Sequence, residues 1–231
     1  MMVPFSAWTV PFRNARALVQ LQFGDVEGAM HLLRGALREV GENVGTSTHR
    51  FNLADGELRL VFSQDPIQCV DSTTDSESVF RCPCMILPQH GVGDEFDLQN
   101  ASFRDLNLLA MSLLFNLGLC FQLRALSGVD PGKWSKNVRR AIALYNAALK
   151  IVSIIESNDP HILAMIRPVA IAIGNNLAAV LAEVHDRCNL DKCLRWTMHR
   201  VDSTNHPELV KLFWTNFQSW NSLGDQAAAA A

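Results

Sequence analysis

The stretch from Leu106 to Leu126 constrains the fold of this chain more than any other, because it is apolar almost all the way round. Its few polar side chains, among them Ser112 and Asn116, cannot cover one face of a helix. A helix without a polar face is one that other elements surround. Gly118, inside the stretch, leaves room for a neighbouring helix to cross closely. We therefore expect an all-helical, repeat-like protein built around this segment.

Charge is unevenly distributed along the 231 residues. Residues 41–100 contain ten Asp or Glu against three Arg and no Lys, a net charge of -7, so the remainder carries +4 of the total of -3. A mildly basic body with an acidic segment does not suit general nucleic-acid binding, which needs many cationic phosphate contacts. With 48% hydrophobic residues the chain can bury a sizeable core. We expect one helical domain, residues 1–221, with an acidic insertion at 41–100.

The sequence also indicates an intracellular protein without a membrane span. Residues 1–13 lack the basic start and long apolar run of a secretory signal. The most apolar window, Leu163 to Val184, is interrupted by Arg167 and Asn175, so we interpret it as a core helix. Six cysteines in a chain without such a signal are expected to stay reduced. The expected compartment is the cytoplasm or the nucleus.

Hydrophobic periodicity divides most of the chain into helices. Apolar residues recur three or four positions apart, which is helical spacing. A disordered, alanine-rich tail is expected at 222–231. The predicted helix pairs are 14–40, 101–157 and 161–201, with a capping helix at 206–221.

Turn and cap residues set the expected helix boundaries. Gly41 is a plausible C-cap for the second helix, and Ser135 is expected to cap the helix that follows the central stretch. Pro160 and Pro207 suit the first turns of later helices. Pro168 either kinks its helix or marks its true start.

The insertion at 41–100 has a different character. Glu57–Phe62 alternates in polarity, and Ser78–Leu87 is apolar but contains Pro83, so both are strand candidates. The tract Asp71–Glu77 between them is typical of a solvated loop. A long structureless insertion is unusual in a compact domain, so we expect a small β-hairpin.

Two parts of the chain share one spacing of small and large side chains. A helix with a small residue, Ala17 or Gly118, precedes each part, and small residues in one helix accept large ones from its partner. A third, fainter pair has Ala178 in the place of Gly118 and Thr197 where an alanine is expected. The shared spacing is that of Ala29, Leu33, Ala36 and Leu37 in one part and of Ala141, Tyr145, Ala148 and Leu149 in the other.

This pattern resembles the tetratricopeptide-like helical repeat. The segments FNLGLCFQLRAL, RRAIALYNAALKIV and NNLAAVLAEV are similar to those of a group of uncharacterised repeat proteins common in diatoms. The resemblance covers residues 14–40 and 101–201, and the insertion has no counterpart in a standard repeat. It implies an α-solenoid scaffold that binds a peptide or another protein along the concave face formed by the first helix of each pair.

The resemblance also implies which side chains would contact that partner. Asn116 and Asn176 fall where such repeats often use an asparagine to hold a ligand's backbone, and an amide can donate and accept at once. The alternative is that both amides cap or cross-link neighbouring helices. Matching positions lack Lys or Arg, so capture of a C-terminal carboxylate is not expected. The candidate binding residues are Asn14, Ser112, Asn116, Leu119, Asn175 and Asn176.

No motif predicts a catalytic centre, a resident metal or a cofactor. The alternative from a different class is a small metal- or redox-active protein that uses Cys82 and Cys84, because two close thiols are half of a zinc site. A third hypothesis is a homo-oligomer in which the insertion covers the groove of its own or a neighbouring copy. The favoured hypothesis is a non-enzymatic protein-interaction module.

Overall fold

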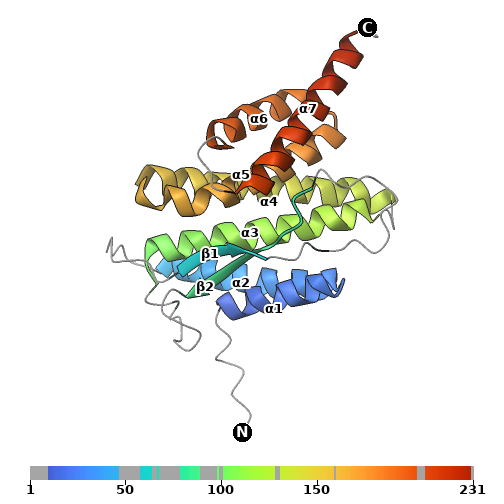
Figure 1. Cartoon of the computed structure of the whole chain (residues 1–231). Coiled ribbons are helices and arrows are strands. Elements are labelled where there is room, and N and C mark those ends of the chain that lie inside the picture. Colours follow the sequence, from blue (N-terminus) through green and yellow to red (C-terminus); the bar gives the residue numbers. More distant parts are fainter. Residues whose placement is uncertain are drawn as a thin grey trace.

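The described part of the chain is mostly helical and carries one small antiparallel sheet (Figure 1). The structure is a computed structural model that describes residues 10–46, 58–63, 67, 79–88, 98, 101–127, 131–158, 160–201 and 206–229. In chain order the elements are α1 (Val10–Gln22), α2 (Val26–Thr46), β1 (Leu58–Phe62), β2 (Cys84–Pro88), α3 (Phe103–Leu126), α4 (Pro131–Asn158), a 3-10 turn (Pro160–Ile162), α5 (Leu163–Glu183), α6 (Arg187–Val201) and α7 (Pro207–Ala229).

Helix α3 is buried nearly all the way round, as its sequence predicts, and lies in the middle of the molecule (Figure 1). Ser102 caps it by accepting a hydrogen bond from the Asp105 N–H at 3.1 Å. Helices α3 and α5 are both long and apolar enough to cross a membrane. However, 89% and 78% of their most apolar windows are buried inside the molecule, which is the environment of a core helix.

The helices pack in consecutive pairs, α1 with α2, α3 with α4 and α5 with α6. Small residues allow the close approach that the sequence spacing predicts. A Cβ atom added to Gly118 of α3 would lie 2.6 Å from the ring of Tyr145 in α4. In the third pair, a Cβ atom on Gly174 would collide with the Thr197 hydroxyl. The bulk of Thr197, which departs from the expected alanine, is therefore accommodated by a missing side chain on α5.

The turns that join α1 to α2 and α5 to α6 have the same geometry. Gly24 and His185 are the residues of these turns in the left-handed region, with φ of 79° and 57°. The residue that follows each one donates its N–H to the carbonyl five positions earlier, as in a Schellman motif. Those next residues, Asp25 and Asp186, then cap the second helix by accepting from an N–H three positions later. The first and third helix pairs therefore share one detailed design.

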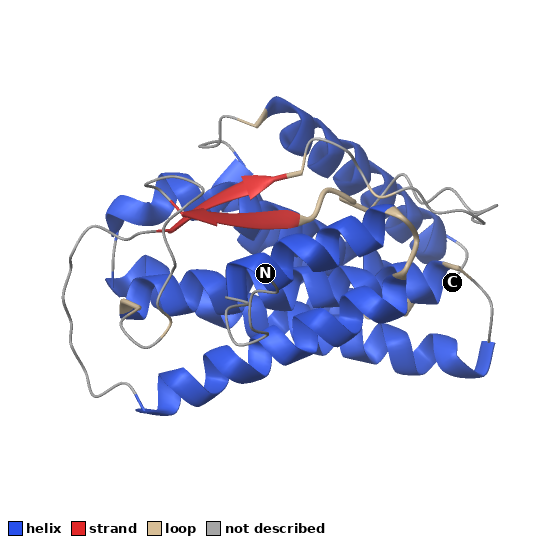
Figure 2. Cartoon of the chain, turned by 90° about the horizontal axis from the view of Figure 1, so that it is seen from below, coloured by secondary structure: helices blue, strands red, loops and turns tan. Residues whose placement is uncertain are grey.

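Strands β1 and β2 pair in antiparallel register, with Leu60 opposite Ile86 and Phe62 opposite Cys84. The sheet lies on one side of the helices (Figure 2). It contacts α1 and α3 through β2, and α3 and α5 through β1. We call this side of α1, α3 and α5 the first-helix face. The predicted small antiparallel sheet is thus confirmed, although β2 begins six residues after Ser78.

Three expected boundaries were wrong. Helix α2 continues through Gly41 to Thr46, because glycine inside an exposed helix costs only about 1 kcal/mol. Helix α4 begins at Pro131, not at Ser135, because proline fits the first turn of a helix. Helix α7 extends to Ala229, since alanine has the highest helix propensity.

Two further expectations concern proline and the loop of the insertion. Pro168 lies inside α5, five residues after its first residue Leu163, so it does not mark the start of that helix. Pro207 opens α7 as predicted. The tract Asp71–Glu77 lies outside the described residues.

Replacing Gly118 by alanine tests the close packing of α3 on α4. The added methyl group would overlap the Tyr145 ring, whose hydroxyl is held by Gln122 at 2.8 Å, so the ring cannot swing freely aside. We expect Gly118→Ala to lower the free energy of unfolding by about 1–3 kcal/mol in urea denaturation. Gly41→Ala is the matched control: it meets nothing within 4 Å, so it should raise stability by up to about 1 kcal/mol. Equal effects of the two substitutions would contradict the packing.

Candidate functional site

Asn116 of α3 holds the backbone of Cys84, the first residue of β2. Its Oδ1 accepts from the Cys84 N–H at 2.8 Å, and its Nδ2 donates to the Cys84 carbonyl at 2.8 Å. The same Nδ2 donates to Asn14 Oδ1 at 2.9 Å, and Asn14 Nδ2 donates to the Cys84 carbonyl at 3.1 Å. All three side chains are fully buried. The two amides therefore satisfy the edge of β2 that faces away from β1.

Asn176 of α5 holds a second residue of the same segment in the same way. Its Oδ1 accepts from the Phe80 N–H at 2.7 Å, and its Nδ2 donates to the Phe80 carbonyl at 3.0 Å. Asn175 Nδ2 lies 3.4 Å from Asn176 Oδ1, and Asn216 of α7 donates to Asn175 Oδ1 at 2.9 Å. These contacts fix the orientation of the amide that holds Phe80.

The spacing of the two amides matches an extended chain that crosses two helices. Asn116 and Asn176 stand two residues before Gly118 and Ala178, the small residues of the second and third helix pairs. The residues they hold, Phe80 and Cys84, are four apart, and an extended chain covers roughly 13 Å over four residues. That reach exceeds the roughly 8–10 Å between the axes of packed helices, so four residues are enough to pass from one helix to the next. The segment therefore crosses the first-helix face from α5 to α3.

The other candidate residues are also buried on or beneath this face. The Ser112 hydroxyl lies 3.5 Å from the Cys84 thiol. Leu119 is fully buried in the core, where it offers no exposed surface. Asn14, Ser112 and Asn116 thus meet at Cys84, and the occupant that all of them contact belongs to this chain. Binding of a separate partner at the six candidate residues stays a prediction.

Sequence reasoning missed several residues of the network. Asp105 Oδ1 accepts from the Leu58 N–H at 3.3 Å and so holds the start of β1. Gln122 of α3 links α4 to α5: its Oε1 accepts from the Tyr145 hydroxyl, and its Nε2 lies 3.5 Å from the Asn176 carbonyl. A signal for Asp105 was present, because Asp105 precedes Ser112 and Asn116 by seven and eleven residues and shares their helix face.

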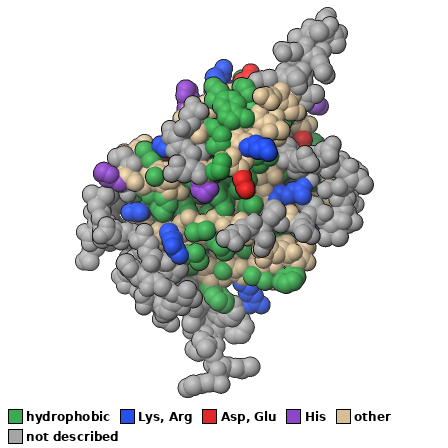
Figure 3. All heavy atoms as spheres, in the orientation of Figure 1, with side chains coloured by type: hydrophobic (Ala, Val, Ile, Leu, Met, Phe, Trp, Pro, Cys, Tyr) green, Lys and Arg blue, Asp and Glu red, His purple; other side chains and the backbone are tan. Residues whose placement is uncertain are grey.

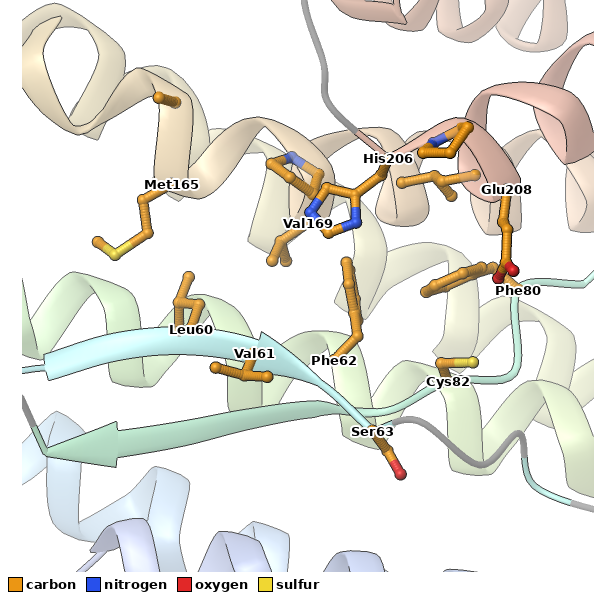
Figure 4. A pocket seen from close by; sticks show the side chains of 14 residues that line it. Leu60, Val61, Phe62, Ser63, Phe80, Cys82, Met165, Val169, His206 and Glu208 are labelled. Atoms are coloured by element: carbon orange, nitrogen blue, oxygen red, sulfur yellow. The ribbon is translucent and has the colours of Figure 1, made fainter.

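A pocket of about 750 Å3 opens beside β1 (Figure 4). It lies between β1, the first half of α5 and the first residues of α7, and most of its lining is apolar. In the space-filling view, hydrophobic side chains reach the surface across this side of the molecule, with basic side chains scattered around them (Figure 3). The pocket is therefore an open, apolar part of the first-helix face. Its lining includes Leu60, Phe62, Met165, Val169, His206 and Glu208.

Cys82 and Cys84 do not converge on one site. Cys82 lines the pocket, whereas Cys84 is fully buried beside Ser112. Burial raises the pKa of the Cys84 thiol to about 12, while the hydrogen bond with Ser112 acts in the opposite direction. A thiol with that pKa is rarely ionised at neutral pH, and the thiolate is the reactive and metal-binding form. Among the described residues, no group of three His, Cys, Asp or Glu could hold a metal ion.

No family model, no curated protein and no solved structure matches this chain. Its function must therefore be inferred from its own contacts.

Replacing Asn116 by alanine tests the hold on the Cys84 backbone. The substitution leaves a buried N–H without its acceptor, and an unsatisfied buried polar group costs about 1–3 kcal/mol. We expect Asn116→Ala to lower the free energy of unfolding by about 2 kcal/mol and to speed amide exchange at Cys84. Asn158→Ala removes an exposed amide that bonds only within α4, so it should change stability by less than about 0.5 kcal/mol. Unchanged exchange at Cys84 would contradict the clamp.

Thiol labelling tests the environments of the cysteines. Burial raises the pKa of the Cys84, Cys120 and Cys193 thiols to about 12, whereas Cys188 is exposed. Iodoacetamide at pH 8 should label Cys188 in the folded protein and the three buried thiols only after unfolding, as read by peptide mass spectrometry. Between pH 9 and about 12 only the thiols of the unfolded chain ionise. The raised pKa values therefore contribute to the free energy of unfolding fully below pH 9, and this contribution is lost as the pH rises from 9 towards 12. Rapid labelling of folded Cys84 would contradict its burial.

Proposed function

We propose that this protein is a non-catalytic protein–protein interaction module. Its helix pairs α1/α2, α3/α4 and α5/α6 would form a degenerate tetratricopeptide-like solenoid, with α7 as the capping helix. A peptide or protein segment would bind on the first-helix face. The repeated α1–α2 and α5–α6 turns and the close Gly118–Tyr145 contact support the repeat design.

One observation carries the proposal: two asparagines at matching places of α3 and α5 each bind both the N–H and the carbonyl of one residue in an extended segment. This recognition is directed at the backbone and does not depend on the side chains of the bound segment. A surface that holds extended chain in this way is chemically suited to peptide recognition. In this molecule its occupant is the segment Phe80–Cys84.

The free part of the first-helix face is the more favourable place for a partner. The segment around Cys84 is tethered to the domain, and a tethered segment acts at an effective concentration of about millimolar. A partner that displaced it would also have to expose Cys84 and Ile86, which are buried. The pocket beside β1 needs no such displacement. We therefore place the partner segment in this pocket, alongside the sheet.

Selection of linear peptides displayed on phage, with the full-length protein as bait, tests the proposal. Ala164 is an exposed residue of α5 that lines the pocket, and an arginine there would fill it without disturbing the core. We expect Ala164→Arg to raise the dissociation constant of the selected peptides at least about tenfold. Ala143→Arg, on the exposed side of α4, is the matched control and should leave binding unchanged.

Failure to enrich any linear peptide on the full-length protein would overturn the interaction module. Equal binding of the selected peptides to wild type and to Ala164→Arg, with an unchanged melting temperature of the variant, would overturn the placement of the partner in this pocket.

A further inference from the structure

The hydrogen-bonding pattern of the sheet shows which backbone groups of β1 are directed away from β2. The Ser63 N–H donates to the Pro83 carbonyl at 2.9 Å, so residues 63 and 83 form a hydrogen-bonded pair. Hydrogen-bonded pairs alternate along an antiparallel ladder. Val61 and Arg59 therefore bond to β2, whereas Leu60 and Phe62 direct their N–H and carbonyl groups to the opposite edge.

The two outer edges of the sheet are treated differently. On β2, the outward groups of Cys84 are bonded by Asn116 and Asn14. On β1, the outward N–H of Leu58 is bonded by Asp105. Among the described residues, no further strand borders β1. The outward groups of Leu60 and Phe62 therefore mark the stretch of the sheet that can accept another strand.

That edge faces the pocket. Leu60, Val61, Phe62 and Ser63 all line it, although successive side chains of a strand point to opposite faces. A cavity along the edge of a strand borders consecutive residues in this way, because it meets the backbone between the two faces. Figure 4 shows the same arrangement, with β1 between β2 and the pocket.

The size of the pocket matches one short strand. A residue in a packed sheet occupies roughly 160 Å3, from a rise of about 3.3 Å, a strand spacing of about 4.8 Å and a layer spacing of about 10 Å. The pocket of about 750 Å3 therefore has room for a short strand, and a strand that pairs along the whole of β1 would be about five residues long.

The elements that border the pocket favour a linear segment over a folded partner. Across the pocket from the edge of β1 stand α5 and the start of α7, which form its opposite wall (Figure 4). A second copy of this chain has its own β1 recessed in the same way, so two such edges cannot meet. A linear segment is narrow enough to enter. Apolar side chains at alternate positions would meet Leu60, Phe62 and Val169.

We propose that an extended segment of a partner protein, about five residues long and apolar at alternate positions, adds to the sheet as a third strand beside β1. This inference rests on the proposed interaction function and specifies its binding mode. Main-chain bonds to Leu60 and Phe62 would provide affinity, and the apolar lining would select the side chains.

Amide hydrogen exchange on the full-length protein, with a phage-selected peptide as the probe, tests the third strand. In the free protein the Val61 amide should be protected, and the Leu60 and Phe62 amides should exchange at least about tenfold faster. Saturation with the peptide should slow exchange at Leu60 and Phe62 at least about tenfold, with little change at Val61. Equal protection of all three amides in the free protein would overturn the inference, because the edge would already be bonded.

N-methylation of the probe peptide gives a second test that does not depend on folding of a variant. Methylation at alternate positions should weaken binding at least about tenfold, and methylation at the positions between should not, because strand backbone groups alternate in direction. Binding that depends on Ala164 but shows no period of two would overturn strand addition and leave the interaction function standing. Failure to enrich any peptide would overturn both.

Discussion

Paired hydrogen bonds from two asparagine side chains decide where the insertion lies, and the layout of the first-helix face depends on them. Asn116 and Asn176 each replace a missing strand by offering one acceptor and one donor to a single residue. Without such partners, the backbone of Cys84 could not be buried at an acceptable free-energy cost. A helical domain can therefore carry extended chain on its surface, because side-chain amides complete the hydrogen bonding that a wider sheet would provide.

This design needs a rigid foundation, which the apolar α3 provides. Its burial on all sides fixes the depth and direction of Asn116 and Ser112, and contacts with α4 fix its rotation. The Tyr145 ring of α4 against Gly118 of α3 is one such contact, and the Tyr145 hydroxyl also donates to Gln122 of α3. Helix α3 therefore carries both core-packing residues and the polar residues that hold β2. A change in the packing of α3 would move the side chains of Asn116 and Ser112.

The helices and the strand candidates could be predicted from the sequence, because periodicity and burial are local properties of a segment. The position of the sheet could not. Asn116 and Asn176 were identifiable as polar residues on a shared helix face, but an amide that bonds to backbone leaves no complementary signal in the residue it holds. Phe80 is separated from Asn176 by 96 residues, and because the contact is made by the Phe80 backbone, its side chain gives no sequence signal for it. The boundary errors at Gly41 and Ser135 arose from weak local preferences that tertiary packing overrode.

The separation of Phe80 from Asn176 along the chain has a consequence for the synthesis of the protein on the ribosome. Phe80 is synthesised 96 residues before the amide that binds it. At a rate of about 5–20 residues per second, the segment waits roughly 5–20 seconds for that partner. During this interval Asn116 is made first, so the strand can be anchored at Cys84 while its other end stays open. The order of translation therefore allows the contact with α3 to form before the contact with α5.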